Sequence, residues 1–253
     1  MSSKYILSLG SNCEVGMMIN RKYNNIYSNL FNWTNITLDN LLLTLNNCEH
    51  LYNNNDNYKI VYRLLSGTYN VYSSKNIDDF RKYYLDNPNN YVVHIDYEFY
   101  IDNKYIFWSH GTVEEDINKF INCNLDSLEN YKSIVFSKIN HLIENTISVL
   151  NNNTDIIKVY IKCLKNEYTL ESLTNLENMP IFNRPNIYIG IICEYDENIN
   201  IHIKNKNIFL VRCNKLTGHG EAIYSELYNT QEKYFYLFET IDRIASDQRP
   251  NTL

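Results

Sequence analysis

A cysteine follows the first apolar run of the chain, at the expected start of a helix. The run 5–9 ends at Gly10, and Ser11, Asn12 and Cys13 lead into a segment with apolar residues at helical spacing. The dipole and unpaired amides at a helix N-terminus stabilise an anion, which lowers the pKa of a thiol. The amides from Ser11 to Cys13 could also hold an oxyanion, and Gly10 permits a tight turn. The pattern predicts a nucleophilic thiolate at Cys13, with a packed structural cysteine as the alternative.

Two histidines in the middle of the chain are candidates for the base that takes the proton of that thiol, and an aspartate is a candidate for orienting the base. His110 follows the second strand of a predicted hairpin. If the turn centres on Asn103, paired positions sum to 206, and 206 − 110 = 96 places Asp96 beside His110, where a carboxylate could orient the imidazole ring. A turn shifted by one residue places Tyr97 there instead. His94 shares the polar strand face with Asp96 and is the rival base. The alternative for His110 is a surface histidine at a strand end, and the alternative for His94 is a solvated strand face.

Two blocks of the sequence resemble a known protein family. The block Ser8-Leu9-Gly10-Ser11-Asn12-Cys13-Glu14-Val15-Gly16, followed by Phe31-Asn32-Trp33, resembles the N-terminus of the DUF1796 family, which is described as papain-like cysteine peptidases. The segment Phe107-Trp108-Ser109-His110 resembles the part of that family that contains its histidine. The chain departs from the family pattern at Asn32 and at Gly111, where the family carries aspartates. The resemblance covers the first two thirds of the chain.

The resemblance implies a cysteine peptidase or a related hydrolase that cleaves an amide or an ester without a cofactor. Cys13 would be the nucleophile, and His110 would be the base that takes its proton. The resemblance does not identify the peptide or ester substrate.

Two other functions are open at this point. Ser11 follows Gly10 in the manner of the nucleophile of SGNH-type serine esterases, whose parallel α/β fold suits the C-terminal half of the chain better than a papain-like fold does. The departures at Asn32 and Gly111 also suit a non-catalytic interaction protein on the same scaffold. Such a protein, for example from an AT-rich virus or parasite, would bind a host protein as its partner.

The candidate residues must be positioned by the elements that the apolar pattern predicts. Residues 91–101 alternate between apolar and polar side chains and return through 105–108, which predicts an antiparallel hairpin. Residues 125–150 carry apolar side chains at three- and four-residue steps, which predicts the longest helix. Continuous apolar runs predict buried strands at 156–163, 187–193 and 208–213. We expect one α/β domain over residues 1–253, with a central, mostly parallel sheet flanked by helices, an inserted antiparallel hairpin and a soft boundary near residue 151.

Composition and charge argue against several classes of function. The chain has 23 Lys and Arg against 29 Asp and Glu, a net charge of −6, so a nucleic-acid partner is disfavoured. No apolar run approaches the roughly 20 residues that span a bilayer, and the N-terminus lacks the apolar region of a signal peptide. The six cysteines show neither metal nor redox spacing. We therefore expect free thiols in a cytoplasmic protein with no membrane partner, no metal and no cofactor.

Overall fold

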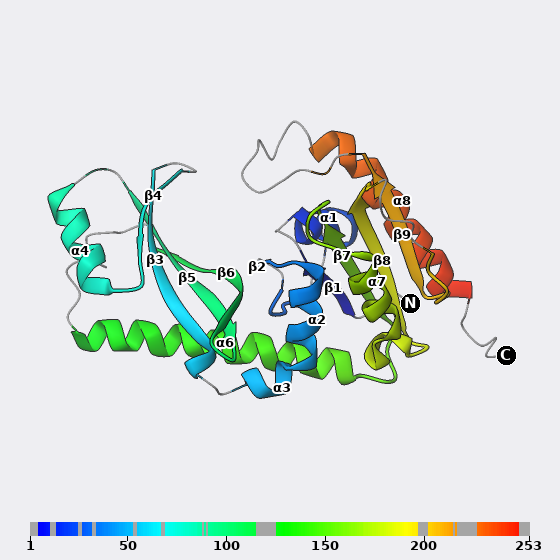
Figure 1. Cartoon of the computed structure of the whole chain (residues 1–253), viewed down its shortest axis with the longest axis horizontal. Coiled ribbons are helices and arrows are strands. Elements are labelled where there is room, and N and C mark those ends of the chain that lie inside the picture. Colours follow the sequence, from blue (N-terminus) through cyan, green and yellow to red (C-terminus); the bar gives the residue numbers. More distant parts are fainter. Residues whose placement is uncertain are drawn as a thin grey trace. The chain divides into compact units, whose positions relative to one another are not determined.

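The computed structural model describes residues 5–10, 14–24, 27–31, 34–52, 55–66, 69–87, 89, 91–114, 125–196, 202–214, 216 and 227–247. Contacts group the chain into two compact units (Figure 1). Unit 1 consists of residues 1–49 and 143–253, and unit 2 consists of residues 50–142. The sequence pattern predicts one domain with a soft boundary near residue 151, whereas the boundaries between the two units fall after residues 49 and 142. The number of independently folding domains stays a prediction.

Unit 1 is built on a four-stranded parallel sheet of order β1-β7-β8-β9 (Figure 1). The strands are β1 (Tyr5–Gly10), β7 (Ile157–Cys163), β8 (Ile187–Glu194) and β9 (Ile208–Cys213). Every residue of β7 is buried, as are the first seven residues of β8, because both faces of the sheet are covered. The predicted α/β fold with a mostly parallel sheet is confirmed, and the three predicted apolar runs are β7, β8 and β9.

Helices cover the two faces of this sheet. On one face, α1 (Glu14–Tyr23) and α8 (Leu227–Asp247) share a buried core with apolar side chains of the strands. On the other face, α2 (Leu38–Asn46) contacts β1 and packs against α7 (Leu170–Asn178) (Figure 1). The Thr37 side chain caps α2 by accepting a hydrogen bond from the Asn40 amide at 3.3 Å. The shorter elements of this part of the chain are β2 (Thr34–Asn35), α3 (Cys48–Leu51) and the 3₁₀ helix η2 (Pro180–Asn183).

Unit 2 contains an antiparallel sheet in which the strands of the unit follow the order β6-β5-β3-β4. Its elements are η1 (Asn55–Asn57), β3 (Tyr58–Ser66), β4 (Tyr69–Ser74), α4 (Ile77–Asp86), β5 (Val92–Ile101) and β6 (Lys104–Glu114). The predicted hairpin is confirmed as β5 and β6. Its turn residues Asp102 and Asn103 have φ angles of 50° and 62°, the left-handed conformation that a tight two-residue hairpin turn requires.

The long helix α6 (Leu125–Asn151) begins in unit 2, where its residue Phe136 and the helix α4 pack on the apolar face of the antiparallel sheet. The ring of Phe136, on α6, meets Tyr58 of β3 edge to face at 4.9 Å between centroids. The ring of Phe80, on α4, lies 5.8 Å from Tyr62 of the same strand. The predicted helix at 125–150 is confirmed. No helix in the described ranges, α6 included, combines the length and the apolarity needed to cross a membrane.

Candidate functional site

The strand and the helix that the sequence predicts on either side of Cys13 are confirmed. β1 ends at Gly10 and α1 begins at Glu14, so only three residues connect them. Those residues, Ser11, Asn12 and Cys13, lie outside the described ranges. The connection leaves the carboxyl end of a parallel strand, which is the end at which α/β sheets bind their ligands. The roles of Cys13 as nucleophile and of the Ser11 to Cys13 amides as oxyanion donors stay predictions.

A buried lysine lies beside Gly10 on the neighbouring strand. In the parallel pairing of β1 with β7, Gly10 is the register partner of Lys162. Lys162 is only 1% exposed, which is rare for lysine because burial removes the hydration of its charge. Sequence reasoning missed this residue. The signal was visible, since Lys158 and Lys162 are two lysines inside an otherwise apolar run.

The neighbours of Lys162 on β7 show which face of the sheet it shares. Tyr160 belongs to the core formed with α1 and α8. The ammonium group of Lys158 forms an ion pair with Asp242 of α8. Because residues two apart on a strand point to the same face, Lys162 lies on this face as well. The lysine is therefore on the side of the sheet that α1 covers.

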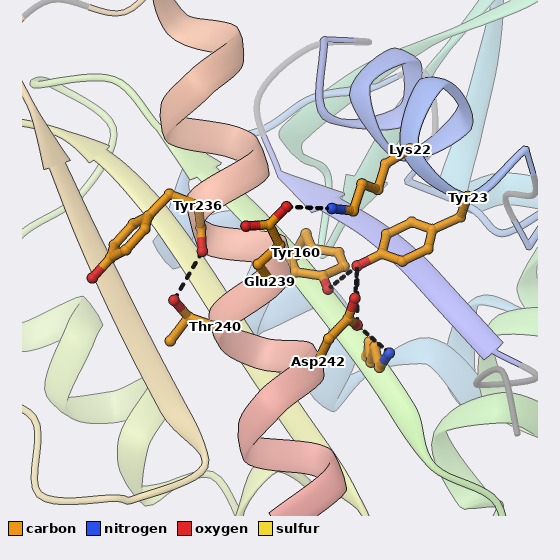
Figure 2. Close-up of polar contacts among 8 residues, drawn as sticks. Lys22, Tyr23, Tyr160, Tyr236, Glu239, Thr240 and Asp242 are labelled. Carbon is orange, nitrogen blue, oxygen red and sulfur yellow. Dashed lines mark hydrogen bonds and ion pairs between the residues drawn. The ribbon is translucent and has the colours of Figure 1, made fainter.

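Figure 2 shows the polar network that joins α1, α8 and β7 on this face. The hydroxyl of Tyr23, at the end of α1, donates to the Asp242 carboxylate at 3.1 Å and lies 3.1 Å from the hydroxyl of Tyr160. Burial raises the pKa of both phenols, so both stay protonated at neutral pH. Nearby, Lys22 of α1 pairs with Glu239 of α8 at 2.8 Å. The network holds both helices against the sheet and is structural in character.

In the hairpin, the predicted pairing is wrong next to the turn, where Ile101 pairs with Lys104 and the numbers sum to 205, but a register shift between Phe99 and Tyr100 restores it from Phe99 to Tyr97. Tyr97 pairs with Ser109, and these numbers sum to 206 as predicted. The register then shifts between Ile95 and Tyr97, so Asp96 lies at a β-bulge, opposite positions 110 and 111. The backbone of His110 is part of β6, whereas its side chain lies outside the described side chains. The pairing of Asp96 with His110 through their side chains stays a prediction.

Asp96 has a cationic partner that the sequence did not reveal. The Nε of Arg63, on β3, lies 3.2 Å from Oδ2 of Asp96, which is 1% exposed. Arg63 is also the register partner of His94, and from that position its side chain reaches Asp96 two residues along β5. A buried carboxylate next to a guanidinium has its charge compensated. Arg63 therefore competes with any imidazole for Asp96. The sequence could not identify Arg63 as the partner of Asp96, because the residue pattern of β3 does not show which strand β3 pairs with.

The cysteines of the described ranges are all buried. Cys48, Cys163, Cys193 and Cys213 are free thiols, and each is at most 5% exposed. Burial raises the pKa of Cys48 to about 12 and that of Cys193 to about 11. Such thiols are protonated and shielded at neutral pH, so they react slowly. Among the described residues, no group of three or more His, Cys, Asp or Glu side chains is placed to hold a metal ion.

Comparisons with protein-family models, with curated proteins and with solved structures found no match for this chain. The resemblance of the Cys13 and His110 blocks to the DUF1796 family therefore stays a prediction from the sequence. Function has to be argued from the residues and from the elements that carry them.

Proposed function

We propose that this protein is a cysteine hydrolase in which the thiolate of Cys13 attacks the carbonyl carbon of an amide or an ester. The observation that carries the proposal is the three-residue connection from the carboxyl end of β1 to α1, with Cys13 immediately before Glu14 in the chain. An anion at that point of the chain gains from the dipole of α1 and from amides that have no partner inside the helix. A thiol stabilised in this way is largely a thiolate at neutral pH.

The proposed reaction proceeds through a covalent acyl-enzyme. Attack forms a bond between Sγ of Cys13 and the carbonyl carbon, and moves an electron pair onto the carbonyl oxygen, where the Ser11 to Cys13 amides donate to it. Collapse of this intermediate expels the amine or alcohol, which takes a proton from the histidine. Water then hydrolyses the thioester. His110 is the proposed base, with His94 as its rival.

The proposal uses a cysteine and a histidine without a third residue. The charge of Asp96 is already compensated by Arg63 at 3.2 Å, which supports a structural role for this carboxylate. An Asp96→Asn variant that keeps its hydrolytic reactivity would agree with this assignment.

The first test measures how fast iodoacetamide alkylates Cys13 as a function of pH. Cys123→Ser serves as the background, so that the remaining cysteines besides Cys13 are the four buried ones. The proposal expects a midpoint at least about one unit below the ordinary thiol value of about 8.5. Cys13→Ser is the control that must remove the fast reaction. A midpoint at or above about 8.5 contradicts the proposal.

The same measurement distinguishes the two histidines. An imidazolium near the thiolate stabilises it, so His110→Gln should raise the alkylation midpoint, and His94→Gln should leave it unchanged. The opposite pattern assigns the base to His94. If neither variant moves the midpoint, neither His110 nor His94 is paired with the thiol.

A serine esterase is the second candidate, because a parallel sheet with helices on both faces is the fold expected for an SGNH-type enzyme. Reaction with a fluorophosphonate probe that is lost in Ser11→Ala and kept in Cys13→Ala would establish it. A folded protein that reacts with neither probe would instead favour the non-catalytic interaction protein.

A further inference from the structure

A polar cavity of about 690 Å³ lies in unit 1, between the end of α7, the 3₁₀ helix η2 and the segment that leads into β9. Pro185 precedes β8 and Asn207 directly precedes β9, so the cavity is at the amino ends of these two parallel strands. It is therefore at the opposite end of the sheet from Gly10, where the chain leaves β1 toward Cys13. Its volume is in the range of small-molecule sites, roughly 300–1,000 Å³.

Three basic side chains of the cavity have no partner in the part of the chain that the structure describes. His202, Lys204 and Lys206 lie in the segment before β9, and all three residues are exposed. None of these side chains makes a hydrogen bond or an ion pair with a described residue. The two ammonium groups thus face the cavity uncompensated on a chain whose net charge is −6. They are available to bind an anion.

The carboxylate of the lining, Glu177, is already engaged by the backbone that carries the lysines. Its Oε1 accepts hydrogen bonds from the amide of Lys204 at 2.5 Å and from the amide of Asn205 at 2.6 Å. These two bonds fix the segment on the end of α7. With two lysines and one glutamate, 2 − 1 leaves the lining with a charge of +1 while His202 is neutral.

Asn207 adds a buried hydrogen-bond acceptor to the cavity. The residue is only 6% exposed, and its Oδ1 accepts no hydrogen bond from a described residue. The Asn207 backbone is fixed, because its amide donates to Oδ1 of Asn205 at 2.9 Å. A buried acceptor without a donor is costly, and a hydroxyl group that enters the cavity would satisfy it. The exposed carboxamides of Asn178 and Asn183 line the same cavity and supply further polar groups.

The lining also indicates which kind of anion fits. Although 14% of the chain is aromatic, no Phe, Tyr or Trp is among the described residues that line the cavity. Protein sites for nucleobases commonly stack the base on such a ring. The combination of ammonium groups with carboxamides therefore favours a ligand made of an anionic group and hydroxyl groups over a nucleotide.

We propose that this cavity binds a small phosphorylated polyol such as a sugar phosphate, with its phosphate held by Lys204 and Lys206. A phosphate monoester carries about two negative charges near pH 7, and its oxygens accept charge-assisted hydrogen bonds from both ammonium groups. The hydroxyl groups of the ligand bond to the carboxamides, with Oδ1 of Asn207 as one acceptor. The site is separate from the proposed hydrolase reaction and does not depend on it.

The test titrates the full chain with glucose 6-phosphate, ribose 5-phosphate and glycerol 3-phosphate, and follows the backbone amides of Lys204 and Asn207 by NMR. At least one of the three should bind saturably with a Kd below about 1 mM, and more tightly than inorganic phosphate. Its unphosphorylated counterpart should bind at least about tenfold more weakly, because it cannot pair with the lysines.

Variants of exposed lysines locate the binding. Lys204→Met and Lys206→Met should each weaken it about tenfold. Lys165→Met is the matched control, because Lys165 is also an exposed lysine of unit 1 but follows the carboxyl end of β7. It should leave the Kd unchanged, and so should Cys13→Ser.

Four results would overturn the inference. They are no binding of any of the three esters, inorganic phosphate binding as tightly as the best ester, adenosine monophosphate binding more tightly than all of them, and an equal loss of affinity in Lys165→Met. Loss of binding in Cys13→Ser would also overturn it, because the ligand would then occupy the proposed hydrolase site. None of these results decides whether Cys13 is a nucleophile, which the alkylation profile tests separately.

Discussion

At the scale of single residues, the ion pair between Arg63 and Asp96 yields a stability prediction. The Asp96 side chain is 2% exposed, and its Oδ2 lies 3.2 Å from Nε of Arg63. Removing one partner of a buried pair leaves a charge that is neither hydrated nor compensated. Arg63→Met should therefore lower the free energy of unfolding by about 3 kcal/mol, as measured by urea denaturation.

The matched control for this pair is the double variant with Arg63→Met and Asp96→Asn. It removes both charges, so it should be more stable than Arg63→Met alone by about 1 kcal/mol or more. A double variant no more stable than Arg63→Met would show that the pair contributes nothing beyond the packing of the arginine side chain.

At the scale of elements, the absence of a side chain at Gly190 of β8 lets Tyr160 of β7 and Leu237 of α8 pack closely against this strand. A Cβ at this position would lie 2.8 Å from Cδ1 of Tyr160 and 3.0 Å from Cγ of Leu237. The Tyr160 ring cannot easily give way, because it packs on Phe238 at 4.5 Å and its hydroxyl is bound to Tyr23. Gly190→Ala should therefore destabilise the protein by about 1–3 kcal/mol through overpacking, measured by urea denaturation.

The control for this prediction is Ile191→Val on the same strand. Ile191 is fully buried, so loss of one methylene should cost about 0.5–1.5 kcal/mol without any overlap of atoms. A Gly190→Ala protein that is as stable as the wild type would mean that the sheet and α8 shift apart at little cost.

At the scale of the whole molecule, buried thiols and phenols make stability depend on alkaline pH. Burial raises the pKa of Cys193 from 9.0 to about 11 and that of Tyr58 from 10.0 to about 12. A raised pKa in the folded state favours the neutral form, so its stabilising contribution is complete below the unfolded pKa and is lost as pH rises toward the folded pKa. The free energy of unfolding should therefore fall from about pH 9 to about pH 11.

Urea denaturation at a series of pH values checks this expectation, with Cys193→Val as the test of one contributor. The variant removes a thiol that ionises more readily in the unfolded chain, so its stability should fall less steeply over the same interval. Wild-type stability that stays constant across this range would contradict the assignment of neutral, buried thiols.

Local patterns predicted much of the fold and part of the candidate site. The strand before Cys13, the helix after it and the hairpin of β5 and β6 are confirmed, because each is encoded by residues that are neighbours in sequence. The sequence pattern left β3, β4 and α4 unassigned. β3 is partly buried on both faces and β4 is an exposed edge strand, so neither shows the alternation that marks a half-buried strand.

By itself, then, the sequence determined which residues are candidates for chemistry, which local elements carry His110 and Asp96, and which elements flank Cys13 in the chain. Only the tertiary structure decided which distant residues lie beside them. The pairing of β1 with β7 brings Lys162 to Gly10, and the pairing of β3 with β5 brings Arg63 to Asp96. The physical reason is that the alternation of side chains along a strand fixes its faces but not its partner, which is chosen by the packing of the whole sheet.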